Sequence, residues 1–397
     1  MKKINKSSTF STATAAGDVG LAEGVEKVRD KILWLTWKDR RHPAAGGAEA
    51  VNEAIAKRLV QNGVSVTFIV AGAPGLPAEE TIDGCRVIRL GNRWTVYWLA
   101  YRYYKKHFVG FADLVIDEVN TFPFFCRFYV KEKNILFVHQ LCRQIWFYQM
   151  IFPLSLLGYF LEPLYLRLLS KTTVITVSQS TKNDLIKYGF NGERVKIISE
   201  GIELSPAEDL ANINCSSQPT ILALGSIRSM KRTAQIVAAF ELAKKQLPDL
   251  QLMVVGDANS RYGQKVIKLI ANSPYRQAIQ VLGKVSQKQK IQIIQQAHLL
   301  VVASVKEGWG LTVTEAASQG VPAVVYNVDG LRDSCHDGVT GLLAQSGSPI
   351  DLAEKIVKLI SDPELYQQYR QNAWQDSQNY NYRKSYEDFT EMINRLI

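Results

Sequence analysis

The feature that most constrains the fold is an apolar strand that runs directly into a glycine-containing turn and then into a helix of small residues. Residues 298–304 are apolar enough for a buried strand, and Glu307, Gly308 and Gly310 follow it. A helix is expected over 312–319, after which a Gly-Val-Pro sequence stops it before the next apolar strand. In an open α/β sheet, such a strand-to-helix turn lies where ligands bind. The sequence therefore predicts a ligand site at this turn.

The backbone of this turn is suited to an anion. Gly308 and Gly310 lack a Cβ atom and let the chain approach a ligand closely. The N–H groups at the start of the helix, at Leu311 and Thr312, have no partner within the helix and favour a negative group such as a diphosphate. We expect these four residues to bind such an anion.

Two carboxylates accompany the expected phosphate site. Glu307 stands where an anion is expected to bind, which makes sense if it accepts hydrogen bonds from sugar hydroxyls beside the phosphate. Glu315, eight residues further on, is placed to accept hydrogen bonds from ribose hydroxyls. The alternative is a helix start that carries two solvated glutamates by chance.

This stretch resembles the E-x7-E motif of the family-four retaining glycosyltransferases. The resemblance rests on the two glutamates with seven residues between them and on the string E-G-W-G-L-x3-E-A-A-S-x-G-V-P, which begins at Glu307. It implies the GT-B fold, in which two Rossmann-like, doubly wound parallel-sheet α/β domains face each other across a cleft. It also implies a nucleotide-activated sugar as the donor.

Short apolar runs alternate with helical periodicity along the chain, which is typical of parallel α/β sheets. Its 397 residues suit two domains, and the small and polar residues of 201–219 mark the linker. We predict a polar extension over 1–30, an N-terminal domain over 31–203, a C-terminal domain over 218–378 and a helix over 379–397. The resemblance implies that the first domain binds the acceptor, that the second binds the nucleotide sugar, and that the last helix crosses back to the first domain.

Two basic residues follow the first predicted strand of the second domain. In the family, an arginine and a lysine of this segment clamp the donor diphosphate, and Lys231 matches the family lysine. Ser226 stands at the arginine position, and Arg228 comes two residues later. Two cations near a helix start can offset the charge of a diphosphate leaving group. The alternative is an exposed basic turn.

The resemblance assigns further roles outside the turn. Gly47 belongs to a glycine loop that faces the donor phosphates, His139 approaches the donor sugar from the end of its strand, and Val285 lies near the nucleotide base. The alternative for His139 is a structural histidine. Asp117 and Glu118 end a neighbouring strand, where one helps the acceptor to lose its proton or both cap helices.

No cofactor and no metal are predicted. The chain lacks a G-x-G-x-x-G sequence after its first strand, which argues against a nicotinamide or flavin site. The donor half lacks a D-x-D-type motif, and we expect no requirement for Mg²⁺. The five cysteines show no C-x-x-C spacing, which argues against a zinc site and a disulfide framework. Together with a polar start that does not resemble a secretory signal, this predicts a cytoplasmic protein.

Positive charge is concentrated in the first half of the sequence. Residues 1–200 contain 27 Lys and Arg against 18 Asp and Glu, in a chain whose net charge is +10. Residues 93–108 combine aromatic side chains with four cations: Arg93, Arg102, Lys105 and Lys106. We predict no nucleic-acid partner and a peripheral contact of 93–108 with the inner face of an anionic membrane, with 145–161 as a shallow apolar addition. The alternative is an ordinary helix with an aromatic core face and solvated cations.

These observations lead to one functional hypothesis and two alternatives. The chain is expected to be a retaining hexosyltransferase that moves glucose from UDP-glucose, or a similar hexose, to an acceptor hydroxyl in polysaccharide or glycolipid assembly. Glu307, His139, Lys231 and Arg228 are the expected catalytic residues. The alternatives are a nucleotide-sugar 2-epimerase of the same architecture and a non-catalytic binding protein, which Ser226 favours.

Overall fold

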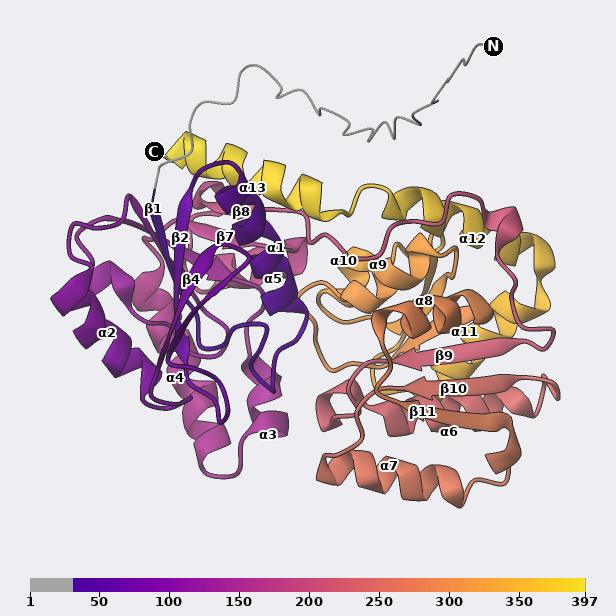
Figure 1. Ribbon diagram of the computed structural model, residues 1–397. Helices are drawn as coiled ribbons and strands as arrows, with labels where there is room; N and C mark the ends of the chain where they lie inside the picture. The colour runs from indigo at the N-terminus through magenta and orange to yellow at the C-terminus, as the bar shows by residue number, and fades with distance from the viewer. Residues whose placement is uncertain (1–30, 397) are drawn as a thin grey trace, which may run out of the picture.

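The computed structural model describes residues 31–396, so the extension predicted over 1–30 and the final residue, 397, lie outside it. The described chain contains an eight-stranded sheet and a six-stranded sheet, each covered by helices on both faces (Figure 1). The two sheets belong to the two predicted halves of the chain.

The first sheet has the strand order β3-β4-β2-β1-β5-β6-β7-β8. Its strands are β1 (Lys31–Leu35), β2 (Ser65–Ala71), β3 (Glu79–Ile82), β4 (Cys85–Leu90), β5 (Leu114–Glu118), β6 (Lys133–Val138), β7 (Val174–Thr176) and β8 (Val195–Ile197). Strand β3, which was not predicted from the sequence, pairs antiparallel with β4, whereas the other neighbouring strands of this sheet pair in parallel. The reason is local: Asp83 and Gly84 both have positive φ and form the two-residue turn of a hairpin.

Successive residues of the first sheet point to opposite faces, and each face packs against a different set of helices. Ile32 and Trp34 pack toward α1 (Gly47–Gln61) and α13 (Tyr382–Leu396). Leu33 and Leu35 pack toward α2 (Val96–His107). The remaining helices of this domain are α3 (Trp146–Gln149), α4 (Leu154–Leu169) and α5 (Gln179–Lys187).

The second sheet is entirely parallel and has the order β11-β10-β9-β12-β13-β14. Its strands are β9 (Thr220–Leu224), β10 (Gln251–Val255), β11 (Ile279–Gly283), β12 (Leu299–Val302), β13 (Ala323–Tyr326) and β14 (Gly341–Ala344). The helices around it are α6 (Thr233–Lys244), α7 (Arg261–Ala271), α8 (Gln287–Gln296), α9 (Leu311–Ser318), α10 (Leu331–Ser334), α11 (Pro349–Ser361) and α12 (Pro363–Ser377). One continuous apolar core lies within this domain.

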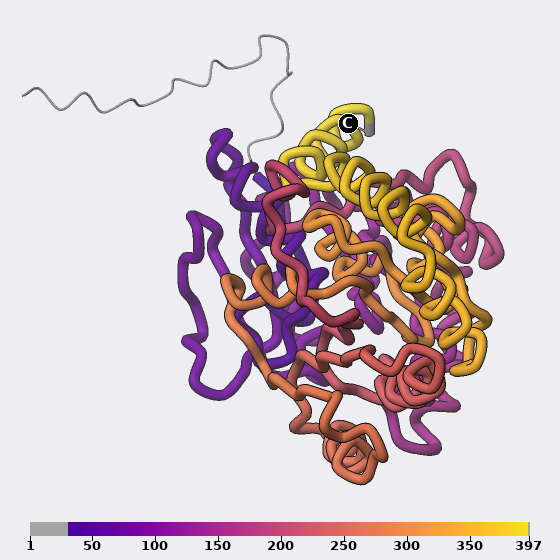
Figure 2. The backbone as a smooth tube through the Cα atoms, turned by 90° about the vertical axis from the view of Figure 1, so that its right-hand side faces the viewer, coloured from indigo at the N-terminus to yellow at the C-terminus, as the bar shows by residue number. Residues whose placement is uncertain are grey.

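The chain ends by returning to the first domain. Helix α12 packs against α9 in the second domain, whereas α13 packs against α1 in the first. Figures 1 and 2 show this last part of the chain, in yellow, running along one side of the molecule. The buried ring of Phe389 stacks on Trp34, with ring centroids 5.7 Å apart. Asp388 accepts a hydrogen bond of 2.9 Å from the backbone N–H of Ser199. The predicted crossing of the last helix is therefore present.

Neither half contains a membrane-spanning helix among the described residues, because none of their helices is both long and apolar enough to cross a bilayer. Four of the five cysteines are buried, and all five are unpaired.

Candidate active site

A cleft of about 540 Å³ lies between the two domains. The carboxyl ends of the parallel strands of both sheets open toward it, as expected for doubly wound sheets. Nearly all the residues selected from the sequence line it: Gly47, His139, Arg228, Lys231, Glu307, Gly308, Gly310, Leu311, Thr312 and Glu315. Val285 does not line the cleft, because it packs against the core of the second domain before α8 begins.

Lys231 and Glu307 form an ion pair in this cleft. Lys231 follows β9, Glu307 follows β12, and these two strands are neighbours in the sheet, which brings their following residues together. The hydroxyl of Ser304 donates a second hydrogen bond, of 2.5 Å, to the same carboxylate oxygen. Arg228 lies at the start of the short 3₁₀ helix 229–231 that carries Lys231. This part of the cleft therefore combines the cations of Arg228 and Lys231 with the partly compensated carboxylate of Glu307.

Helix α9 begins at the cleft. Gly310 precedes it with a φ of 103°, a conformation that side-chain-bearing residues rarely adopt. A Cβ atom on Gly308 would lie 2.7 Å from the carbonyl oxygen of His139, and one on Gly47 would lie 2.4 Å from the side chain of Leu311. These glycines therefore allow the two domains to approach each other at the site, in addition to the role expected of them at a ligand.

Glu315 is paired with a lysine that the sequence analysis did not select. The ammonium of Lys290, on α8, lies 2.6 Å from the Glu315 carboxylate, and both residues line the cleft. Burial raises the pKa of Glu315, and the charge of Lys290 acts in the opposite direction. The signal available in the sequence was a lysine in the helix that follows β11, the segment expected near the nucleotide base.

His139 is held by side chains of the first domain. Its Nδ1 lies 3.2 Å from the Glu200 carboxylate, and its Nε2 lies 3.2 Å from the amide oxygen of Asn52. Burial acts to lower the pKa of His139, but the hydrogen bond and charge of Glu200, with the charges of Glu118 and Glu49, raise it. Glu200, which was not selected from the sequence, therefore orients this histidine.

The two carboxylates at the end of β5 are buried and do not line the cleft. Asp117 accepts hydrogen bonds of 2.9 Å from the N–H groups of Phe124 and Cys126, which fixes the following loop. Glu118 accepts hydrogen bonds from the Trp34 indole at 3.0 Å and from the Asn52 amide at 2.6 Å. Burial raises the pKa of Glu118 to about 7, while the charge of His139 acts in the opposite direction.

Glu49 is a further carboxylate at the cleft that sequence reasoning missed. It lies in the first turn of α1 and accepts a hydrogen bond of 2.6 Å from the N–H of Gly46. Lys38 and Asn120 contact its other oxygen, at 3.2 and 3.0 Å. Its position two residues after Gly47 was the available signal. The start of α1 is thus occupied by a side-chain carboxylate of the protein itself.

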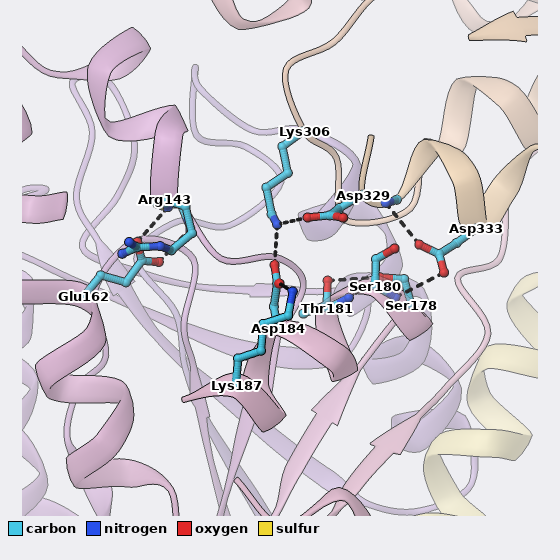
Figure 3. A network of polar contacts seen from close by, with 12 residues as sticks. Arg143, Glu162, Ser178, Ser180, Thr181, Asp184, Lys187, Lys306, Asp329 and Asp333 are labelled. Atoms are coloured by element: carbon cyan, nitrogen blue, oxygen red, sulfur yellow. Dashed lines mark hydrogen bonds and ion pairs between the residues drawn. The ribbon is translucent and has the colours of Figure 1, made fainter. Parts of the chain in front are cut away.

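Polar contacts fix the two domains beside the cleft. Figure 3 shows Lys306 between Asp184 of α5 and Asp329 of the second domain. The Lys306 ammonium lies 2.6 Å from Asp184, and the backbone N–H of Ser180 donates to Asp333 at 3.1 Å. Burial acts to raise the pKa of Asp184, but Lys306 and then Lys187 lower it below its usual value.

Two family models match the chain, one in each domain. The model described as Glycosyltransferase Family 4 matches residues 45–206, and the model described as Glycosyl transferases group 1 matches residues 210–376. The chain therefore belongs to the family-four glycosyltransferases, as the motif at 307–322 predicted.

Curated relatives are distant and match only in part. N-acetyl-alpha-D-glucosaminyl L-malate synthase of Bacillus anthracis is 26% identical over 186 residues, which are 47% of this chain and 46% of the relative. The matched regions span between 25% and 63% of the first three curated relatives.

Solved structures match the whole fold. Sucrose-phosphate synthase from Thermosynechococcus elongatus superposes with a TM-score of 0.75 at 20% identity, covering 93% of this chain and 99% of that one. Anabaena HepE in complex with UDP-glucose superposes with a TM-score of 0.69 at 18% identity, covering 92% and 99%. The predicted GT-B architecture is confirmed.

The buried group around Glu118 predicts a pH dependence of stability. Its carboxyl ionises near pH 4.5 when exposed and near 7 in the folded protein, so stability contributed by the neutral form is lost as pH rises through this window. The raised pKa of His139 acts in the same direction, because its contribution is complete at low pH and is lost as pH rises through its folded value. We expect the melting temperature of wild type to fall more between pH 5 and 8 than that of Glu118→Gln. The corresponding difference in the free energy of unfolding should be on the order of 1 to 3 kcal/mol.

Thermal unfolding followed by circular dichroism measures this difference. The exposed Glu354→Gln on α11 is the matched control and should follow the wild-type pH profile. A Glu118→Gln profile parallel to wild type would show that this carboxyl titrates normally in the folded protein.

Proposed function

We propose that the chain is a retaining hexosyltransferase that moves a hexose from a UDP-sugar to an acceptor hydroxyl in polysaccharide or glycolipid assembly. The observation that carries the proposal is the convergence of Arg228, Lys231 and the start of α9 in a single cleft with Glu307 and Glu315. Cations and helix N–H groups suit a diphosphate, and paired carboxylates suit the hydroxyls on either side of it.

The leaving group is stabilised by charge in this proposal. When the bond from the anomeric carbon to the phosphate oxygen breaks, its electron pair stays with the nucleoside diphosphate. Lys231, Arg228 and the N–H groups at Leu311 and Thr312 would then face the added negative charge. When the diphosphate binds, the Lys231 ammonium gains a second anionic partner. The Glu307 carboxylate would then accept hydrogen bonds from the Ser304 hydroxyl and from hydroxyls of the sugar.

The acceptor attacks from the face that the leaving group vacates. Its oxygen forms the new bond to the anomeric carbon, and its proton passes to the departing phosphate oxygen, so the reaction needs no nucleophilic side chain. Glu307 would lie near the positive charge that develops at the anomeric carbon. His139, oriented by Glu200 and Asn52, would define the wall of the sugar pocket on the first domain.

Two similarities favour a UDP-hexose donor. The fold of Anabaena HepE, solved with UDP-glucose, covers almost this entire chain. The Bacillus anthracis relative is named for an α-linked glucosaminyl product, which supports the hexose and not the nucleotide. Glucose with UDP is accordingly the proposed donor pair, without a metal ion.

Replacing the cleft lysine tests the proposal. Lys231→Ala should lower kcat/KM for UDP release from UDP-glucose by about a hundredfold, because one charge that stabilises the leaving group is lost. Lys268→Ala, an exposed lysine of α7, is the control and should match wild type. Activity of Lys231→Ala within a few-fold of wild type would remove this residue from the mechanism.

Substitutions of Glu307 and Glu315 should have different effects on the affinity for UDP. Glu307→Gln should reduce sugar transfer yet bind UDP within about threefold of wild type, because its proposed partner is the sugar. Glu315→Gln should weaken UDP binding by about tenfold, because its proposed partner is the ribose.

Titration calorimetry with UDP, using Glu354→Gln as the control, measures both affinities. A loss of UDP affinity confined to Glu307→Gln would reverse the assignments.

A further inference from the structure

Helix α4 carries an apolar face that no described residue covers. Its inner positions, such as Tyr165, Leu166 and Leu169, are buried against the first sheet. Its outer positions are also apolar and exposed: Leu154, Leu156, Leu157, Phe160, Leu161, Leu164 and Leu168. A helix that is apolar all round is normally buried on all sides. The outer face of α4 is therefore suited to an apolar environment outside the folded chain.

The loop before α4 extends this face. Ile151 and Phe152 are 77% and 78% exposed, the highest values among the large apolar residues of the described chain. The guanidinium of Arg93, at the start of the predicted membrane segment 93–108, contacts the sulfur of Met150 at 3.7 Å. The loop 150–153 and the start of α2 therefore lie side by side.

Helices α2 and α4 cover the same face of the first sheet. Leu33 and Val115 pack toward α2, and Leu136, which shares their side of the sheet, packs toward α4. Trp94, just before α2, and Trp98, on the outer side of α2, are exposed. The guanidinium of Arg102 lies 4.7 Å from the Trp98 ring. For residues 93–108, the alternative was an ordinary helix whose aromatic side chains face the core. That alternative is wrong for Trp94 and Trp98, because both are exposed.

The charged residues of the two segments that form this surface have almost entirely one sign. Residues 93–108 contain no Asp or Glu, and residues 143–171 contain only Glu162. Glu162 is buried, and it accepts hydrogen bonds of 2.7 Å from the N–H groups of Cys142 and Arg143. The exposed charges of these two segments are therefore cations, which gain about 1 kcal/mol each near an anionic lipid surface. An acidic protein would satisfy the cations but would not need seven exposed apolar side chains on one helix.

The apolar surface reaches the rim of the cleft. Gln149, at the end of α3, lines the cleft, and its side chain contacts the sulfur of Met230 at 3.7 Å. The carbonyl of Tyr148 accepts a hydrogen bond of 3.2 Å from the hydroxyl of Ser229. Only a few residues separate these contacts from Ile151 and Phe152.

We infer that the first domain docks on an anionic lipid bilayer through the outer face of α4 and the loop 150–153, with the cations of α2 beside the headgroups. This placement brings the mouth of the cleft to the bilayer and selects an acceptor hydroxyl carried by a lipid. The docking stands on the surface alone, whereas the lipid-linked acceptor rests on the proposed transfer reaction. The main contact thus lies on 150–168, and the segment 93–108 supports it.

Flotation with vesicles of phosphatidylcholine and phosphatidylglycerol tests the docking. Wild type should float with these vesicles at low salt. The triple variant Leu157→Ser, Phe160→Ser and Leu164→Ser should bind at least about tenfold more weakly, because three apolar side chains no longer enter the bilayer. The matched control replaces three exposed apolar residues of the second domain, Leu269, Val339 and Ile350, by serine and should float as wild type does. Replacing Arg102, Lys105 and Lys106 by glutamine should reduce binding and its sensitivity to salt.

Three results would overturn the docking. In the first, wild type remains in the soluble fraction at low salt. In the second, the α4 variant floats with the vesicles as wild type does. The third is a lipid-free wild type that light scattering shows to be a dimer and an α4 variant that is a monomer, since the face would then be covered by a second copy.

Activity in solution separates this inference from the proposed function. UDP release from UDP-glucose without vesicles should be equal in wild type and the α4 variant. A protein that floats with the vesicles but releases no UDP would support the docking and contradict the proposed transferase activity.

Discussion

The site depends on how closely the two domains approach each other. Lys306, which is almost fully buried, joins Asp184 of the first domain to Asp329 of the second. It immediately precedes Glu307, so this contact fixes the turn that carries the cleft carboxylate. Removing one member of such a buried set costs more than the net value of the pair, because a charge is left without compensation.

Apolar packing strengthens the same arrangement. Trp309 lies between the cleft glycines Gly308 and Gly310. Its side chain is part of the apolar core of the first domain and packs against Tyr380. Helix α13 then stacks Phe389 on Trp34 beneath β1 and β2. The turn at 307–310 is therefore positioned by both domains, and the glycines at 308 and 47 leave room for that contact.

The local sequence pattern was enough to predict most strands and helices. It did not predict which side chains contact each other, because those contacts join residues far apart in the sequence. The strand and helix around Glu307 followed from apolar periodicity, glycine and proline, which act over a few residues. Strand β3 escaped prediction because it begins with two glutamates at the edge of the sheet and shows no apolar run. Lys290 and Glu200 escaped because their partners, Glu315 and His139, are brought to them by the tertiary fold. Family resemblance located the cleft, but the motifs that carry the resemblance do not include Lys290 or Glu200.

Proton NMR of the sugar released to water tests the proposed transfer of a hexosyl group with retention, without knowledge of the acceptor. UDP-α-glucose is incubated with the enzyme alone, and the anomeric proton of free glucose is followed before mutarotation mixes the two forms. Retention predicts α-glucose as the first product, together with UDP. First appearance of β-glucose would contradict retention, and release of a sugar with inverted configuration at C2 would identify an epimerase instead.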